Sequence, residues 1–189
     1  MLGDYNGDIL VLYGDTPFIS DETISDIAKA RASADLVVLG FHAADPGRYG
    51  RLVTDGDALE KIVEYKDASE GERAITLCNS GVMAARAADM FEWIDAIGNE
   101  NASCEYYLTD CVGNARARGK TVRCVICDEA ATLGVNSRAQ LAEAEAAFQT
   151  RARTEAIENG VTLFAPETVH FAYDTVIGRD TRSEEHTSE

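Results

Sequence analysis

Short apolar runs that end abruptly on glycine and aspartate are the feature that most constrains the fold of this chain. Residues 9–12 read Ile-Leu-Val-Leu and lead directly into the stretch YGDTP at residues 13–17. An unbroken apolar run of this length, bounded by turn residues, is typical of a strand that is buried on both faces. We therefore predict a strand over residues 8–13, followed by a turn that carries Asp15.

Further predicted strands alternate with predicted helices. Ser20 has the side chain of an N-cap and is followed by two acids, which favours a helix that ends near residue 33. The predicted strands cover residues 35–42, 49–54, 59–65, 75–84 and 121–127, and the other predicted helices cover residues 87–97, 105–118 and 137–159. This order predicts an α/β fold with a mostly parallel sheet and a small antiparallel insertion near residues 49–66.

Size and charge limit the classes of function. The chain has 189 residues, of which 46% are hydrophobic, and a net charge of −16, which argues against a general grip on nucleic acid or on an anionic membrane. It has neither a long apolar segment nor a signal peptide, and its five cysteines lack the spacing of a disulfide framework. We expect a cytoplasmic protein whose partners include neither nucleic acid nor a membrane.

The C-terminal end of the chain contains two distinct stretches. Residues 173–180 begin an apolar-Ile-Gly-polar pattern of the kind found in β-helix repeats. Residues 182–189, RSEEHTSE, match what a widely used sequencing-library adapter encodes when it is translated in frame. We interpret them as a cloning or assembly artefact and exclude them from the fold prediction.

Asp15 and Asn136 are candidate metal ligands. In open α/β sheets, ligands bind beyond the carboxyl ends of the strands, where Asp15 is expected, and a carboxylate there suits a hard cation such as Mg²⁺. Asp15 can equally be part of an ordinary turn. Asn136 precedes the predicted helix 137–159, so it fits an N-cap as well as a Mg²⁺ ligand.

Other polar residues interrupt apolar segments. Gly50, beside Tyr49, allows close approach of a sugar or a base, and Glu64 is the type of acceptor that binds sugar hydroxyls, although it also fits a solvated strand face. Asn79 lies in an apolar strand, which costs free energy unless its side chain forms hydrogen bonds. At the predicted start of helix 105–118, Tyr107 and Thr109 could reach a ligand. The CxxC pair Cys124 and Cys127 lies in an apolar strand without a second pair, which disfavours a zinc site.

Six short stretches, in order along the chain, resemble one family. LYGDTP, DPGRYGR, IVEYKDA, NSG, EYYLTD and GVNSR follow the pattern of the bacterial bifunctional GlmU family, the uridyltransferase and glucosamine acetyltransferase that makes UDP-N-acetylglucosamine. The resemblance implies a Rossmann-like nucleotide-diphospho-sugar transferase fold, N-terminally truncated. It also implies a nucleotidyltransferase part at residues 1–136, a linker helix at 137–160 and the start of a left-handed β-helix acetyltransferase domain at 161–181.

The resemblance also implies roles for single residues. Asp15 and Asn136 match the two Mg²⁺ ligands of the family. The substrate-binding positions are Tyr13, Gly14, Asp15, Gly50, Glu64, Asn79 and Asn136. In the implied reaction the phosphate of N-acetylglucosamine 1-phosphate attacks the α-phosphorus of UTP and releases pyrophosphate, while Mg²⁺ neutralises charge. The product is UDP-N-acetylglucosamine, and the parent protein is expected to be a homotrimer formed through the β-helix.

The sequence departs from the family pattern at several positions. Ser80 stands where the family usually has Thr, and Cys104 stands where it usually has Gly. The family's Gly-rich phosphate loop and uracil-binding segment are not found in this sequence. We therefore expect no uridyltransferase turnover from residues 1–181, and self-association through the apolar strand at residues 9–12. Two alternatives are another sugar-1-phosphate nucleotidyltransferase and a non-catalytic remnant that binds a sugar nucleotide.

Overall fold

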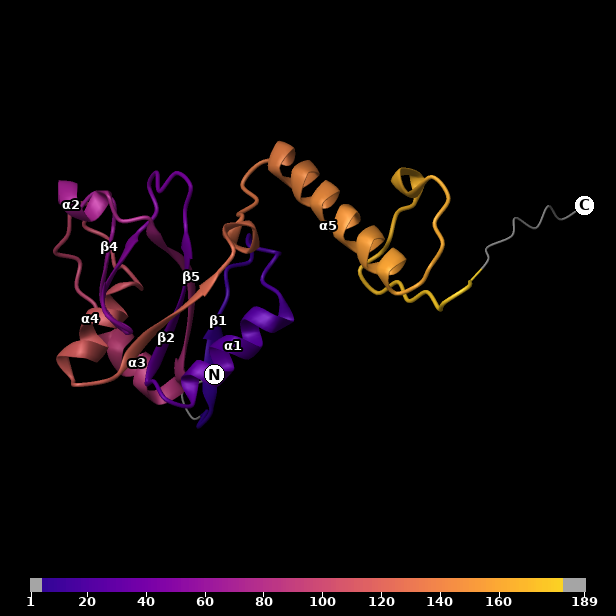
Figure 1. Ribbon diagram of the computed structural model, residues 1–189. Helices are drawn as coiled ribbons and strands as arrows, with labels where there is room; N and C mark the ends of the chain where they lie inside the picture. The colour runs from indigo at the N-terminus through magenta and orange to yellow at the C-terminus, as the bar shows by residue number, and fades with distance from the viewer. Residues whose placement is uncertain (1–4, 182–189) are drawn as a thin grey trace, which may run out of the picture. The chain divides into compact units, whose positions relative to one another are not determined.

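The chain folds into two compact units, Met1–Gly134 and Val135–Glu189, in a computed structural model that describes residues 5–181 (Figure 1). The tail at residues 182–189, interpreted above as an artefact, lies outside the described residues. Within residues 5–181, no helix is both long enough and apolar enough to cross a membrane.

The described strands all belong to the first unit and form one sheet in the order β1-β5-β2-β6-β4-β3. They are β1 (Asp8–Val11), β2 (Leu36–His42), β3 (Arg51–Asp55), β4 (Ala58–Val63), β5 (Leu77–Arg86) and β6 (Val122–Cys127). β3 and β4 form the predicted antiparallel hairpin, and this hairpin joins the main sheet through contacts with β5 and β6. β1 is an edge strand of the described sheet.

The prediction of a mostly parallel sheet is wrong, because β2 and β6 form the one parallel pair among the described strands. β5 inserts antiparallel between β1 and β2. β1, β2 and β6 nevertheless run in the same direction, so their last residues lie at one edge of the sheet. We call this the carboxyl edge, and the opposite one the amino edge.

The side chains of β2 alternate between two hydrophobic clusters, as expected for a strand buried on both faces. Leu36 and Val38 pack in a cluster with residues of α3 (Ala87–Asp95) and α4 (Asp110–Ala117), whereas Val37 and Leu39 pack with residues of α1 (Asp21–Arg31). The helices therefore cover both faces of the sheet (Figure 1). Trp93 of α3 is fully buried in the first cluster, and its indole N–H has no hydrogen-bond partner among residues 5–181.

The start of α1 follows local capping chemistry, whereas α3 and α4 begin without a side-chain cap. The Ser20 hydroxyl accepts a hydrogen bond from the Thr23 N–H at 3.2 Å, which confirms the predicted N-cap of α1. The prediction of a helix from residue 105 is wrong at its start, because α4 begins at Asp110 and residues 105–109 lie outside it. Two short helices, α2 (Glu70–Arg73) and the 3₁₀ helix η1 (Glu129–Thr132), were not predicted.

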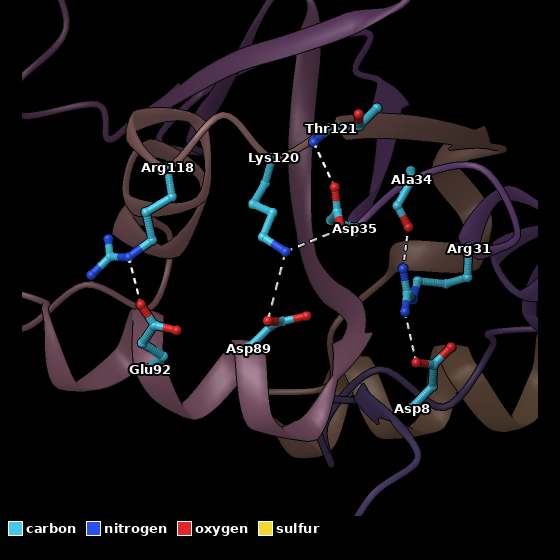
Figure 2. A network of polar contacts seen from close by, with 9 residues as sticks. All are labelled: Asp8, Arg31, Ala34, Asp35, Asp89, Glu92, Arg118, Lys120 and Thr121. Carbon is cyan, nitrogen blue, oxygen red and sulfur yellow. Dashed lines mark hydrogen bonds and ion pairs between the residues drawn. The ribbon is translucent and has the colours of Figure 1, made fainter.

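Ion pairs join the strands at the amino edge (Figure 2). The Asp35 carboxylate accepts hydrogen bonds from the Thr121 N–H at 2.9 Å and from Lys120 Nζ at 3.5 Å, and Lys120 Nζ also lies 3.8 Å from the Asp89 carboxylate of α3. The bond from Thr121 is the main cause that lowers the pKa of Asp35, with Lys120 contributing less. This network fixes the starts of β2 and β6 beside each other.

A second contact at this edge holds α1 to β1. The Arg31 guanidinium donates to the Asp8 carboxylate at 2.6 Å and also to the carbonyl oxygen of Ala34 (Figure 2). Because Asp8 is the first residue of β1, this ion pair ties the end of the helix to the beginning of the edge strand.

The second unit consists of helix α5 (Arg138–Glu158) and the segment that follows it. Ser137 is the N-cap and accepts from the Gln140 N–H at 3.2 Å, so the N-cap interpretation of Asn136 is wrong. The buried Gln149 side chain both donates to and accepts from the backbone of Phe171, each at 2.8 Å. Residues 161–181 contain the 3₁₀ helix η2 (Pro166–Thr168) and no described strand, so the β-helix start remains a prediction.

Candidate functional site: a sugar-sized pocket near the carboxyl edge

The NSG stretch at residues 79–81 forms a bulge in β5. The pairing register shifts here, since Val38 lies opposite Met83 and Gly40 lies opposite Asn79. The Ser80 hydroxyl donates to the carbonyl oxygen of Leu39 at 2.7 Å and accepts from the Val82 N–H at 3.2 Å. The Ser80 hydroxyl, in an otherwise apolar strand, is therefore satisfied locally. Bulges of this kind are frequent next to ligand sites, where they redirect side chains.

The side chain of Asn79 is partly committed to this bulge. Its Oδ1 accepts from the Gly81 N–H at 3.1 Å, and its backbone N–H donates to the carbonyl oxygen of Gly50 at 2.9 Å. Among residues 5–181, the Asn79 Nδ2 atom has no hydrogen-bond acceptor, so it remains free to donate to a ligand.

Gly50 directly precedes β3 and Glu64 directly follows β4, and the two residues lie against each other. A Cβ atom at Gly50 would lie 3.3 Å from Glu64 Oε1 and 3.3 Å from Ile62 Cγ2, so a larger residue at position 50 would crowd the carboxylate. Glu64 Oε1 accepts a hydrogen bond from the buried Thr109 hydroxyl at 3.1 Å. The glycine leaves room for the carboxylate, and the threonine fixes its orientation.

Tyr13 packs over the bulge. A Cβ atom at Gly81 would lie 2.1 Å from Tyr13 Cε2, and Gly81 has a φ of +87°, so only glycine fits beneath the ring. Burial is the main cause that raises the pKa of Tyr13, and the negative charges of Glu64 and Asp15 raise it further. The Tyr13 hydroxyl therefore stays protonated at neutral pH and can act as a hydrogen-bond donor.

A pocket of about 320 Å³ opens beside Glu64. Its walls come from the end of β4 and from the residues that precede and begin α4. They include Glu64, Asp67, Asn101, Tyr107, Thr109 and Asp110. The volume suits one monosaccharide-sized group. The structure thus brings Gly50, Glu64 and Asn79 together, and of these three Glu64 lines the pocket.

Asp15 occupies a turn after β1. Thr16 donates both its N–H, at 3.3 Å, and its hydroxyl, at 3.0 Å, to the carbonyl oxygen of Tyr13, so Gly14 and Asp15 are the central residues of this turn. The Asp15 carboxylate is exposed and accepts no hydrogen bond from the described residues. The turn interpretation of Asp15 is thus confirmed, and the carboxylate is also available to a cation.

Asn136 belongs to the second unit. Its N–H donates to Gln140 Oε1 at 2.8 Å, while its side chain is exposed and has no partner within residues 5–181. The pairing of Asp15 with Asn136 at one metal ion therefore stays a prediction. Within the same described range, no group of three or more His, Cys, Asp or Glu side chains could hold a metal ion.

The CxxC pair lies in β6. Burial raises the pKa of the Cys124 thiol to about 12 and also raises that of Cys127, so both thiols are protonated at neutral pH. A protonated thiol is a poor metal ligand and a poor nucleophile. The two thiols of this strand therefore contribute to packing.

Arg51 is a buried cation that sequence reasoning missed. Its side chain is only 2% exposed, and its guanidinium donates to the carbonyl oxygens of Gly47 at 3.0 Å, of Arg73 at 3.3 Å and of Tyr49. It therefore shapes the loop that leads to Gly50. Sequence reasoning also missed that Thr109 is the hydrogen-bond partner of Glu64. The stretch EYYLTD alone does not indicate this contact, because Glu64 lies 45 residues earlier in the chain.

Comparison with solved structures defines the class of the fold. The chain is similar to a nucleoside-diphosphate-sugar pyrophosphorylase from Vibrio cholerae, with 16% identity and a TM-score of 0.55 over 74% of this chain and 56% of that one. It is also similar to a CMP:2-keto-3-deoxy-manno-octonic acid synthetase complexed with CTP, with 15% identity and a TM-score of 0.53 over 77% of this chain and 63% of that one. These similarities show the α/β nucleotidyltransferase fold with a mixed sheet.

Sequence comparison identifies the family. The chain is 64% identical to the bifunctional protein GlmU of Roseobacter denitrificans over 180 residues, which are 95% of this chain and 40% of that protein. It is 61% identical to the GlmU of Paracoccus denitrificans over 179 residues, with the same coverage of both chains. No protein-family model matches. The chain belongs to the GlmU family and spans about 40% of the length of these relatives.

Proposed function

We propose that the first unit binds the sugar of UDP-N-acetylglucosamine, as part of a uridyltransferase that makes it from UTP and N-acetylglucosamine 1-phosphate. The observation that carries this proposal is the Glu64 carboxylate, which is oriented by Thr109, given space by Gly50 and exposed to a pocket of about 320 Å³. A fixed carboxylate beside a glycine is a suitable acceptor for sugar hydroxyls, because a hydroxyl can approach without a steric barrier.

The charge of the pocket supports a neutral sugar group as its occupant. Four carboxylates line it, those of Glu64, Asp67, Glu100 and Asp110, and its lining includes no Lys or Arg. Such walls repel a phosphate and accept hydrogen bonds from hydroxyl and amide groups. Outside the pocket lining, the Nδ2 of Asn79 and the protonated hydroxyl of Tyr13 offer hydrogen-bond donors. The phosphate groups would then have to lie away from this pocket.

We propose Asp15 and Asn136 as ligands of Mg²⁺. Both offer exposed oxygen atoms that have no partner within residues 5–181, which is the donor chemistry that this cation prefers. When bound, Mg²⁺ would neutralise the charge of the phosphates during nucleotidyl transfer. The residues of this chain would hold the sugar in place and orient its phosphate toward that charge. The acetyltransferase activity and the homotrimer of the parent protein likewise remain proposals.

Calorimetric titration of the chain with UDP-N-acetylglucosamine tests the sugar site. Glu64→Ala should raise the Kd at least about tenfold, because loss of a hydrogen bond to a charged acceptor costs about 1.5 kcal/mol or more. Glu70→Ala is the matched control, since Glu70 is exposed, lies outside the pocket and should leave the Kd unchanged. Equal affinities for the wild type and Glu64→Ala would remove Glu64 from the site.

The metal ligands can be tested without turnover. Mn²⁺, a paramagnetic substitute for Mg²⁺, should broaden the NMR signals of residues 13–16 and of residues 135–138 at the same low concentration. Asp15→Asn should weaken both effects. Broadening confined to one of the two segments would contradict a shared ion.

A further inference from the structure

Asp67 connects two walls of the pocket. Its backbone N–H donates to the carbonyl oxygen of Glu64 at 3.0 Å, and its Oδ1 accepts from the N–H of Ala102 at 2.9 Å. Beside it, Lys66 Nζ donates to the Ser103 hydroxyl at 2.8 Å. Two adjacent residues after β4 thus hold a loop that lies 35 to 37 residues further along the chain.

The loop that they hold, residues 101–105, has a tightly defined conformation. Asn101 Oδ1 accepts from the N–H groups of Ser103 at 3.1 Å and of Glu105 at 3.2 Å. Cys104 has a φ of +53°, in the left-handed region that favours glycine. A non-glycine residue in that region costs about 1 kcal/mol or more and persists where the surrounding structure imposes it. Lys66 and Asp67 supply two hydrogen bonds to this loop from outside it.

This loop continues into the pocket. Asn101 lines the pocket directly, and so do Tyr107 and Thr109, which follow the loop. Thr109 in turn orients the Glu64 carboxylate. A shift of the loop would therefore move one wall of the pocket and also the residue that fixes Glu64.

We propose that Asp67, supported by Lys66, is a positioning residue of the sugar site. It keeps the loop 101–105 docked so that Asn101, Tyr107 and Thr109 meet the sugar in one geometry. This inference rests on the proposed function and adds to it a residue that acts through the loop. The alternative explanation is that Asp67 affects sugar binding through its negative charge alone, since it is one of four carboxylates around the pocket.

Two substitutions separate these roles. Asp67→Asn removes the charge and keeps an oxygen that can accept from the Ala102 N–H, whereas Asp67→Ala removes both. Asp57→Ala is the matched control, because Asp57 is an exposed acid of the same hairpin and lies outside the pocket. For each variant of the full chain, NMR measures the hydrogen exchange of the Ala102 amide, and calorimetry measures the Kd for UDP-N-acetylglucosamine.

We expect Asp67→Ala to speed exchange at Ala102 at least tenfold and to raise the Kd about fivefold. Asp67→Asn should keep Ala102 protected and should raise the Kd less than Asp67→Ala does. Asp57→Ala should stay within twofold of the wild type in both measurements. The proposal is overturned if Asp67→Ala leaves either quantity unchanged, or if Asp67→Asn raises the Kd as much as Asp67→Ala while Ala102 stays protected. A wild-type chain without saturable binding would overturn the proposed function itself, and with it this inference.

Discussion

Gly81 is the residue at which backbone conformation and site geometry depend on each other most strongly. Its φ of +87° is unfavourable for any residue with a side chain, and the ring of Tyr13 occupies the space where a Cβ atom would lie. The absence of a side chain at Gly81 therefore lets the Tyr13 ring pack over the bulge.

Gly81→Ala should lower the free energy of unfolding by about 2 to 4 kcal/mol, the sum of left-handed strain and overpacking. Urea unfolding measures this change. In the double variant Tyr13→Ala and Gly81→Ala, the steric part should disappear and the backbone part should remain, so the two effects should not add. The control is Gly113→Ala in α4, which meets no atom within 4 Å and should stabilise the protein by up to about 1 kcal/mol. Similar losses for both alanines would contradict the assigned clash.

Single residues also show where sequence reasoning stops. Asn136 and Ser137 are adjacent and both have capping side chains, so the sequence offers two equivalent N-caps, and the structure uses Ser137. Cys104 in place of a usual Gly was noted in the sequence, but the positive φ that explains the glycine became clear only from the backbone. Most candidate substrate-binding residues were singled out from the local sequence and given roles by resemblance. The supporting contacts of Thr109 and Gly81 join distant segments of the chain.

At the scale of elements, the positions of the strands and the antiparallel β3–β4 hairpin were predicted well, but the mostly parallel arrangement of the sheet was not found. Apolar runs bounded by turn residues mark a buried strand, yet such a run looks the same whether its neighbours are parallel or antiparallel. β5 is the example, because its insertion between β1 and β2 depends on the connections of the whole chain.

The short helix α2 links stability to pH. Its capping box joins Ser69 and Glu72, and a hydrogen bond from Lys61 is the main cause that lowers the pKa of Glu72 to about 2 from an ordinary value of 4.5. A depressed carboxyl pKa stabilises the fold above the unfolded pKa, and this contribution is lost as the pH falls from about 4.5 toward 2.

Urea unfolding midpoints measured between pH 6 and pH 2 should therefore fall more steeply for the wild type than for Glu72→Gln across that window. Glu70→Gln in the same helix serves as the control, and its curve should run parallel to that of the wild type. A Glu72→Gln curve with the wild-type slope would show that the capping box contributes nothing to the pH dependence.

At the scale of the whole molecule, the division near residue 135 agrees with the place at which the sequence changes from alternating strands and helices to an Ala- and Glu-rich helix. The β-helix predicted after α5 could not be derived from physical principles, because a single turn of that repeat buries too little surface to be stable without its neighbours.

The edge strand β1 predicts how the molecule behaves in solution. Among residues 5–181 no strand pairs with its outer edge, and Leu12 just beyond it is 47% exposed. An open apolar edge favours pairing between chains. Leu12→Lys should therefore lower the apparent mass seen by size-exclusion chromatography with light scattering at high concentration. Leu141→Lys, at an exposed leucine of α5, is the control and should leave the mass unchanged. Equal self-association of both variants would place the contact elsewhere.

The burial of Trp93 makes the two units optically distinguishable. It is the single tryptophan of the chain and lies in the core of the first unit, whereas the second unit contains none. Fluorescence excited near 295 nm therefore reports the melting of the sheet and its helices alone, while circular dichroism at 222 nm also detects α5. The offset between the two melting curves measures directly whether the units unfold together or one after the other.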